Sequence, residues 1–186
     1  MKRVFDIIFV LLITPIILVP FLITCLAVRL SSRGPIFYWS NRVGVNNNFF
    51  RMPKFRTMLE GTPAVATHLL NNPEIYLTPI GAFLRETSLD ELPQLWSIIK
   101  GDMSLVGPRP ALFNQKDLIV LRSKVGLDAL LPGLTGWAQI NGRDTLPIKK
   151  KVSLDLEYMK HQSIYLDLKI IFLTFLKVIK REGISH

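Results

Sequence analysis

The chain has 186 residues, about the size of one domain, so neither a repeat array nor a two-domain architecture is expected. Its 49% hydrophobic content excludes intrinsic disorder, and its single cysteine excludes an intramolecular disulfide, which favours a cytosol-facing location. The formal charge is +9, from 23 Lys and Arg against 14 Asp and Glu. A chain both apolar and basic favours an anionic partner reached from a membrane, with nucleic acid as the alternative source of the charge.

An uncharged apolar run extends from Ile7 to Val28. As a straight helix it would be about 33 Å long at about 1.5 Å per residue, enough to cross a hydrocarbon core of about 30 Å. Pro15 and Pro20 each remove a backbone hydrogen bond, which predicts a kink. The Thr14 hydroxyl would bond a nearby carbonyl at the break, as a polar group in lipid requires.

Basic residues flank this run on both sides: Lys2 and Arg3 precede it, and Arg29 and Arg33 follow it. The positive-inside rule then places both ends on one side of a membrane. We therefore predict a re-entrant hairpin over residues 1–30, broken at Thr14–Pro15, with a kinked spanning helix as the alternative. The run is not followed by a small-x-small cleavage site, so the sequence does not indicate a signal peptide. Cys25 follows a threonine, a poor lipidation context, and is interpreted as an apolar filler.

Residues 31–186 alternate short apolar elements with turn clusters and are predicted to form one domain, a single folding unit with the anchor. Strands are predicted at Ile36–Trp39 and around Phe49–Met52, joined by a hairpin turn at 43–48. Helices are predicted at 79–85, 92–100, 114–122, 149–160 and 166–181. Proline and glycine clusters predict ordered loops at 107–110 and 132–136. The expected fold is a helix-rich α/β domain on a membrane anchor.

The last predicted helix is amphipathic. Lys169, Lys177 and Lys180 fall within one broad arc, and Phe172 and Phe175 lie largely on the other side. Two interpretations stay open. The apolar side packs in the core, or the helix lies at the headgroup boundary with its cations toward anionic lipid phosphates.

Common nucleotide and metal motifs are absent from the sequence, including GxxxxGK, GxGxxG, CxxC and HExxH, and its three histidines are scattered. Two cation-rich loops are more informative. Lys54 and Arg56 follow Pro53, and Arg109 stands between two prolines. The fixed φ of the prolines limits the backbone freedom of Arg109, so little entropy is lost when its guanidinium grips a phosphate. The alternative is a surface arginine in a rigid turn.

Two adjacent carboxylates, Asp90 and Glu91, open a predicted helix between these loops. A structural interpretation is available, because Ser88 and Glu91 have capping-box spacing, or Asp90 caps the helix with Pro93 in its first turn. A helix N-terminus would also lower the pKa of Asp90 and gather anions. An ionised aspartate beside a metal-capable glutamate suits phosphoryl transfer, with the carboxylate as covalent nucleophile.

Several long motifs, in the same order, make the chain similar to the bacterial sugar transferase family. These are the monotopic phosphoglycosyl transferases that begin O-antigen, capsule and glycoprotein glycan assembly. The similarity extends from Lys2 to the C-terminus, and the chain resembles the minimal catalytic form. The motifs are Ser88–Leu95, Lys100–Ser104 with Val106–Pro110, and Pro132–Gln139 with Asn141–Arg143.

The resemblance implies Mg²⁺-dependent transfer of a sugar 1-phosphate from a UDP-sugar to polyprenyl (undecaprenyl) phosphate, with release of UMP through a covalent phosphosugar–aspartate. Asp90 would be the nucleophile and Glu91 the metal ligand. The dipeptide Thr14–Pro15 matches the family's helix break. The implied substrate- or phosphate-binding positions are Lys54, Arg56, Arg109, Arg143, Asp155 and Asp167. For Asp155 and Asp167 the alternative is an aspartate in the first turn of a helix.

The resemblance also implies a location at the bacterial cytoplasmic membrane, with the catalytic domain facing the cytoplasm, anionic headgroups as partners and no nucleic acid. Asp144 replaces a common asparagine and Ile148 a common tryptophan, so the UDP-sugar, the glycan pathway and the oligomeric state stay open. One alternative is a membrane-anchored module that binds anionic lipid or nucleic acid. Another is a glycosyl transferase that releases UDP; release of UMP would exclude both.

Overall fold

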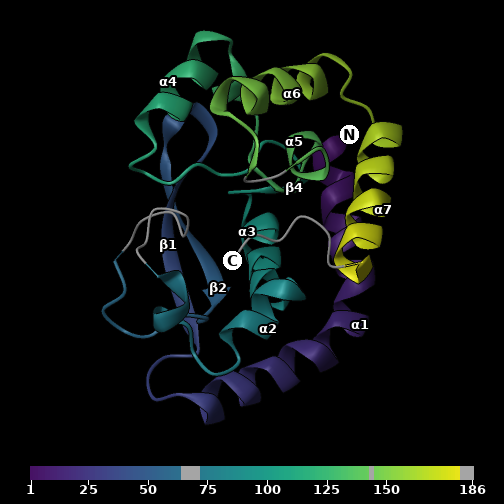
Figure 1. The fold of residues 1–186 in the computed structure, drawn as a ribbon. Coiled ribbons are helices and arrows are strands. Elements are labelled where there is room, and N and C mark those ends of the chain that lie inside the picture. The colour runs from purple at the N-terminus through teal and green to yellow at the C-terminus, as the bar shows by residue number, and fades with distance from the viewer. Residues whose placement is uncertain (64–71, 143–144, 181–186) are drawn as a thin grey trace.

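The protein is described by a computed structural model over residues 1–63, 72–142 and 145–180 (Figure 1). The helix-rich α/β prediction is confirmed. The helices are α1 (Lys2–Ser31), α2 (Gly81–Glu86), α3 (Gln94–Lys100), α4 (Lys116–Lys124), α5 (Trp137–Ile140), α6 (Ile148–Lys160) and α7 (Ile164–Lys180). The strands are β1 (Phe37–Val43), β2 (Phe49–Phe55), β3 (Ser104–Val106) and β4 (Gly133–Thr135). Short 3₁₀ turns are η1 (Val45–Asn47), η3 (Pro73–Tyr76), η4 (Leu89–Glu91) and η5 (Leu127–Ala129).

Two small sheets lie among these helices. The predicted hairpin is present, with β1 antiparallel to β2 and Phe37 opposite Phe55. Its connection includes η1, where Asn46 and Asn47 adopt the left-handed conformation that asparagine tolerates. In the second sheet β3 pairs with β4 in parallel. Strand β3 ends directly before the first predicted loop, whereas β4 lies inside the second, 132–136, so the loop prediction is wrong there. Strands of three residues are too short to give a periodic sequence signal, so the sequence did not predict them.

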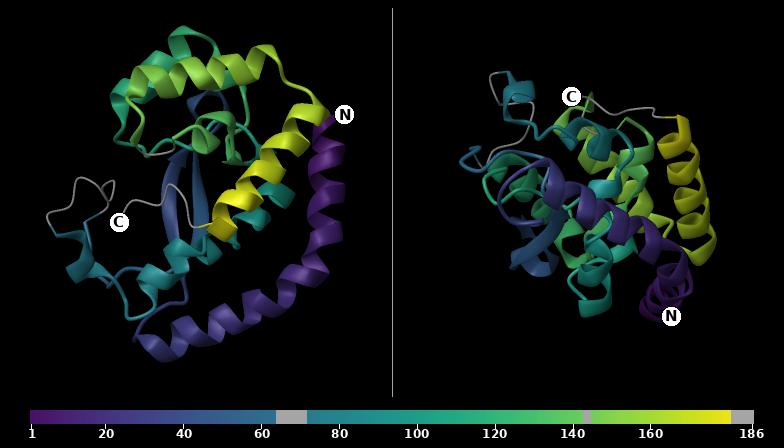
Figure 2. Two further views of the ribbon diagram at one scale, coloured as in Figure 1. Left: turned by 45° about the vertical axis from the view of Figure 1, so that its right-hand side comes forward. Right: turned by 90° about the horizontal axis from the view of Figure 1, so that it is seen from below.

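The apolar run forms one continuous helix, α1, although Pro15 and Pro20 lie inside it. Figure 2 shows that α1 bends, so that it runs along two sides of the domain. The predicted break into a hairpin is therefore not confirmed, and bending is what prolines inside a helix produce. The Thr14 hydroxyl donates to the Val10 carbonyl at 2.7 Å, as predicted.

Both ends of α1 pack against the rest of the protein. Near its start, Val10 is fully buried in a core cluster that includes Ile98 and Ile170. Near its end, Val28 is buried in a second cluster with Phe55 and Leu84. Among the described helices, α1 is long and apolar enough to cross a membrane by length and composition. Its outward face is apolar and exposed, with Ile8, Leu11, Leu12, Ile16, Leu18, Val19, Leu22, Ile23, Leu26 and Leu30.

Helix α7 lies beside the first half of α1 (Figures 1 and 2). Asp167 and Ile170 are buried on its inner side. On its outer side Phe172, Phe175 and Ile179 are each about 60% exposed. The core-packing interpretation is therefore confirmed for the inner side, whereas the headgroup interpretation stays a prediction, for which the exposed outer side leaves room.

Candidate active site

The two adjacent carboxylates lie in η4, the short turn between α2 and α3. Asp90 is only 6% exposed. The Lys54 ammonium, at the end of β2, lies 3.0 Å from Asp90 Oδ2 and 2.8 Å from Glu91 Oε1. Strand β2 therefore positions the Lys54 ammonium so that it contacts both carboxylates.

The capping interpretation of these residues is wrong. No side chain caps η4 or α3, and Ser88 adopts a left-handed backbone conformation with φ of 56°. Pro93 stands directly before α3 instead of inside its first turn. The acid pair is thus directed at Lys54 and contributes no cap to a helix.

Burial raises the pKa of Asp90, and the neighbouring Glu91 raises it further. Lys54 and, more weakly, Arg85 oppose this effect by stabilising the ionised carboxylate. The expectation that a helix N-terminus lowers this pKa is therefore wrong in direction. A three-residue 3₁₀ turn offers little helix dipole, whereas loss of water destabilises the charged form strongly.

Two arginines complete the cationic surroundings of the acid pair. Arg109 Nη1 lies 3.5 Å from Glu91 Oε1. Arg85, in the last turn of α2, interacts electrostatically with Asp90 and donates from Nε to Thr57 Oγ1 at 3.0 Å. Burial lowers the pKa of the Arg85 guanidinium, and Asp90 opposes that change. Sequence reasoning missed Arg85, because a single basic residue at a helix end is ordinary.

The loop that carries Arg109 is held through its carbonyl groups. Proline has no N–H, so such a loop has few donors of its own. Each carbonyl from Pro108 to Ala111 instead accepts a hydrogen bond from another segment. The donors are Gly133 N to Pro108 O at 2.9 Å, Arg122 Nη1 to Arg109 O at 2.7 Å, Arg42 Nη1 to Pro110 O at 3.1 Å and Val43 N to Ala111 O at 3.0 Å.

Arg56 has a different environment from Lys54, although both belong to the same motif. Its guanidinium is buried and donates to the Ser32 carbonyl at 2.9 Å, the Ser32 hydroxyl at 2.8 Å and the Arg33 carbonyl. Arg56 therefore holds the segment that follows α1. Its phosphate-binding role stays a prediction, since its described hydrogen bonds all go to that segment.

The remaining predicted positions have described contacts with residues other than the acid pair, or lie outside the described residues. Asp155, in α6, accepts two hydrogen bonds from Arg122. Asp167, in α7, accepts bonds from Lys2 and Tyr158. Arg143 and Asp144 lie outside the described residues. Ile148 is the first residue of α6 and is partly exposed.

A magnesium site built wholly from protein side chains is not found in the described residues, where no three His, Cys, Asp or Glu groups gather. Magnesium usually takes one or two carboxylates together with substrate phosphates. Asp90 and Glu91 already direct oxygens at one cation, the Lys54 ammonium. The residues present therefore fit a Mg²⁺ ion that is bound jointly with a phosphorylated substrate.

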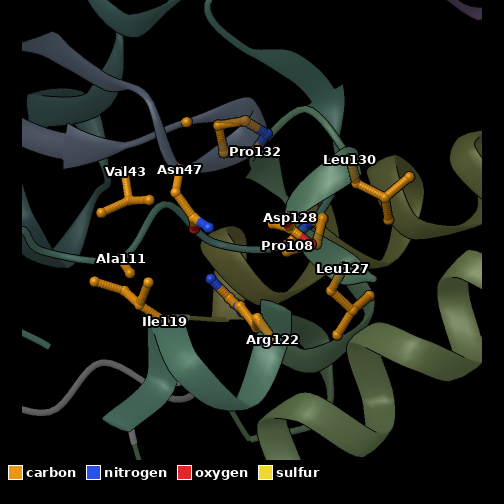
Figure 3. Close-up of a pocket in the computed structure, with 11 residues that line it drawn as sticks. Val43, Asn47, Pro108, Ala111, Ile119, Arg122, Leu127, Asp128, Leu130 and Pro132 are labelled. Carbon is orange, nitrogen blue, oxygen red and sulfur yellow. The ribbon is translucent and has the colours of Figure 1, made fainter. Parts of the chain in front are cut away.

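A small cavity lies behind the Arg109 loop (Figure 3). Its volume is about 30 Å³, and Arg122, Asp128 and Asn47 supply its polar lining. A volume of this size holds about two water molecules, so it is too small for a nucleotide or a sugar. This cavity is therefore not a candidate for the binding of either molecule.

Comparisons with known proteins show the family to which the chain belongs. The family model for bacterial sugar transferases matches residues 1–181. The chain is 42% identical to the uncharacterized sugar transferase EpsL of Bacillus subtilis, over all of this chain and 91% of that protein. It is 36% identical to the exopolysaccharide production protein ExoY of Rhizobium meliloti, over 98% of this chain and 87% of that protein.

A third relative is longer. The chain is 40% identical to the UDP-glucose:undecaprenyl-phosphate glucose-1-phosphate transferase of Escherichia coli, over 95% of this chain but 40% of that protein. The chain therefore spans less than half of this relative and most of the other two.

Proposed function

Because the chain belongs to the bacterial sugar transferase family, we propose that it transfers a sugar 1-phosphate from a UDP-sugar to polyprenyl phosphate and releases UMP. Relatives from Escherichia coli and Klebsiella pneumoniae are named UDP-glucose:undecaprenyl-phosphate glucose-1-phosphate transferases, which supports this donor and acceptor. The name of the Rhizobium relative supports a role in exopolysaccharide production, and we place this transfer at the first membrane step of such glycan synthesis.

The observation that carries the proposal is a buried aspartate surrounded by cations. In the first step, Asp90 attacks the phosphorus that carries the sugar and forms an oxygen–phosphorus bond. The bond from that phosphorus to the bridging oxygen breaks, and UMP leaves with the electron pair. Lys54 and Arg85 favour the ionised carboxylate that this attack requires.

In the second step, a phosphate oxygen of polyprenyl phosphate attacks the same phosphorus. The bond to Asp90 breaks, which restores the carboxylate and yields a polyprenyl diphosphate sugar. Two displacements at one carboxylate let UMP leave before the lipid arrives, so the two bulky substrates need not fit together.

The charges of the diphosphate require compensation during both steps. Arg109, beside Glu91, offers a planar fork suited to phosphate oxygens. Asp90 and Glu91 would hold Mg²⁺, with Glu91 as the principal ligand, and the ion supplies charge neutralisation at the phosphates when bound. Lys54, which contacts both carboxylates, would contribute further positive charge beside the substrate phosphates.

We propose that α1 enters the cytoplasmic membrane and returns to the side from which it came, so that residues 1–30 anchor a cytoplasmic catalytic domain. The support is that both ends contact the same domain. Lys2 pairs with Asp167, and Arg3 donates to the Ile98 and Ile99 carbonyls, while Val28 packs in the cluster at the other end. A spanning helix would have to break one of these sets of contacts.

The exposed apolar faces of α1 and α7 would then lie in the bilayer and at its interface. This arrangement keeps the acid pair near the height of the polyprenyl phosphate headgroup. It also leaves the site open to a soluble UDP-sugar from the cytoplasm.

The direct test measures nucleotide release by the full chain in lipid nanodiscs. The reaction contains undecaprenyl phosphate, Mg²⁺ and one of a panel of UDP-sugars, beginning with UDP-glucose. We expect release of UMP that depends on the lipid acceptor and on Mg²⁺. We also expect a lipid product that carries the sugar phosphate. Release of UDP would indicate transfer of the sugar alone, and a binding module would release no nucleotide with any donor.

A further inference from the structure

Asp155 and Arg122 form a buried ion pair at some remove from the acid pair. Arg122 comes from α4, and its Nε and Nη2 lie 3.1 Å and 2.7 Å from the same oxygen of Asp155, on α6. The two side chains are 12% and 2% exposed. Burying two charges is costly unless further hydrogen bonds use their remaining groups. The hydrogen bond of the remaining terminal nitrogen of Arg122 therefore shows which segment the ion pair holds in place.

That nitrogen, Nη1, donates to the main-chain carbonyl of Arg109 at 2.7 Å. The carbonyl belongs to the residue whose own side chain reaches Glu91. Because prolines stand on both sides of Arg109, the loop is anchored through its carbonyls. A donor at the Arg109 carbonyl sets the orientation of this peptide, and with it the direction in which the Arg109 side chain leaves the backbone.

We propose that Arg122, held in place by Asp155, is a positioning residue that orients Arg109 for phosphate binding in the reaction. The inference rests on the proposed function and deepens it. It gives Asp155 a role through Arg122 and Arg109, with no contact between Asp155 and substrate. The planar guanidinium suits this task because it meets a carboxylate on one edge and still directs a donor at a carbonyl.

The first test replaces Arg122 by Met, which has a similar length but no donors. Misplacing a substrate-binding group by about 1 Å costs about 100-fold in rate, so we expect a 10- to 100-fold loss in kcat for UMP release. This variant also leaves the Asp155 carboxylate buried without its partner, so its stability is expected to fall.

The decisive variant is Arg122→Met combined with Asp155→Leu. Replacing both charges by apolar groups removes the buried unpaired carboxylate and restores the thermal midpoint toward that of the wild type. The donor to the Arg109 carbonyl is still missing, so we expect the loss in kcat to persist. A pair variant that regains both stability and activity would overturn the proposal.

Leu118→Ala is the matched control. Leu118 is buried on the same helix, α4, in an apolar cluster that includes Ala111, and its side chain has no hydrogen-bond donor for the Arg109 carbonyl. We expect a lower thermal midpoint and near-normal kcat when the assay runs well below that midpoint. A loss of kcat as large as that of the pair variant would show that any destabilisation of α4 suffices, and would also overturn the proposal.

A coupling experiment tests whether Arg122 acts through Arg109. In an Arg109→Ala background there is no side chain left to orient, so adding the pair variant should reduce the residual UMP release by less than twofold. A full additional 10- to 100-fold loss would refute action through Arg109. Wild-type protein that releases no UMP would instead contradict the proposed function, which separates the two failures.

Discussion

The Lys2 ammonium lies 2.6 Å from the Asp167 carboxylate, joining the first residue of α1 to the first turn of α7 across 165 positions of sequence. Asp167 is almost fully buried and also accepts a hydrogen bond from the Tyr158 hydroxyl at 2.7 Å. The Tyr158 hydroxyl lies 3.2 Å from the Val106 carbonyl as well. The start of α1 is thereby connected to β3, the strand that leads into the Arg109 loop.

We expect Asp167→Asn to lower the stability of the protein by about 1–3 kcal/mol, because a buried charged acceptor with two donors is lost. Thermal unfolding in nanodiscs measures the change. Asp102→Asn is the matched control, since Asp102 pairs with Lys100, whose side chain is 60% exposed, and such pairs contribute about 0–1 kcal/mol. Equal shifts for the two variants would contradict the importance of the Lys2–Asp167 contact.

Asp90→Asn should abolish turnover while the protein still folds, because the amide keeps the size of the side chain but cannot attack phosphorus. The measurement uses a donor labelled in the sugar, without polyprenyl phosphate. Wild-type protein should retain about one equivalent of label per chain, as a covalent intermediate requires. Retained label or continued turnover in Asp90→Asn would rule out Asp90 as the nucleophile.

Glu91→Gln should lose most of its activity together with its response to Mg²⁺. Glu91 lies beside Asp90, the proposed nucleophile, and presents an oxygen to Lys54, and an amide is a weaker ligand for a hard cation. UMP release is measured across a Mg²⁺ titration. A variant with the wild-type titration midpoint would show that the ion is held elsewhere.

Arg109→Lys should reduce UMP release by about 10- to 100-fold. Lysine keeps the charge but loses the planar fork, and hydrogen bonds to charged groups contribute about 1.5–3 kcal/mol each. Arg51→Lys is the control, because Arg51 is exposed on β2 and its Cζ lies 5.4 Å from the centroid of the Trp39 ring. A near-normal rate for Arg109→Lys would show that only the positive charge at this position matters, and that the planar fork does not.

The re-entrant course proposed for α1 predicts that both of its ends are cytoplasmic. In a Cys25→Ser background, a cysteine at the N-terminus should resist an impermeant thiol reagent added outside intact cells. Pro15→Leu restores an N–H donor and favours a straight helix, so outside labelling should increase. Full outside labelling with Pro15 still present would establish a spanning helix instead.

Much of the secondary structure was accessible from the sequence. The predicted helices at 79–85, 92–100, 114–122, 149–160 and 166–181 correspond to α2, α3, α4, α6 and α7, with ends that differ by a few residues. Apolar periodicity and turn residues specify such elements locally. The parallel β3–β4 pair was not predicted because its strands are stabilised by pairing between distant segments.

Helix α1 also combines properties that are local in the sequence with contacts that depend on the tertiary structure. Its length, its apolar character and the basic residues at both flanks are local properties, and they were read directly from the sequence. The contact of Lys2 with Asp167 and of Arg3 with the Ile98 carbonyl depends on α3 and α7 being folded beside α1. No local pattern identifies those partners.

The sequence by itself determined the chemistry available at the site, since Asp90 and Glu91 are adjacent and two prolines restrain Arg109. Only the tertiary structure decided which other charged groups face them. It brought Lys54 to both carboxylates and Arg85 to Asp90, and it assigned Arg56 to the segment after α1 and Asp155 to Arg122. The physical reason is that a long charged side chain has no periodicity of its own. Its partner and the pKa of that partner follow from burial and from which elements pack together.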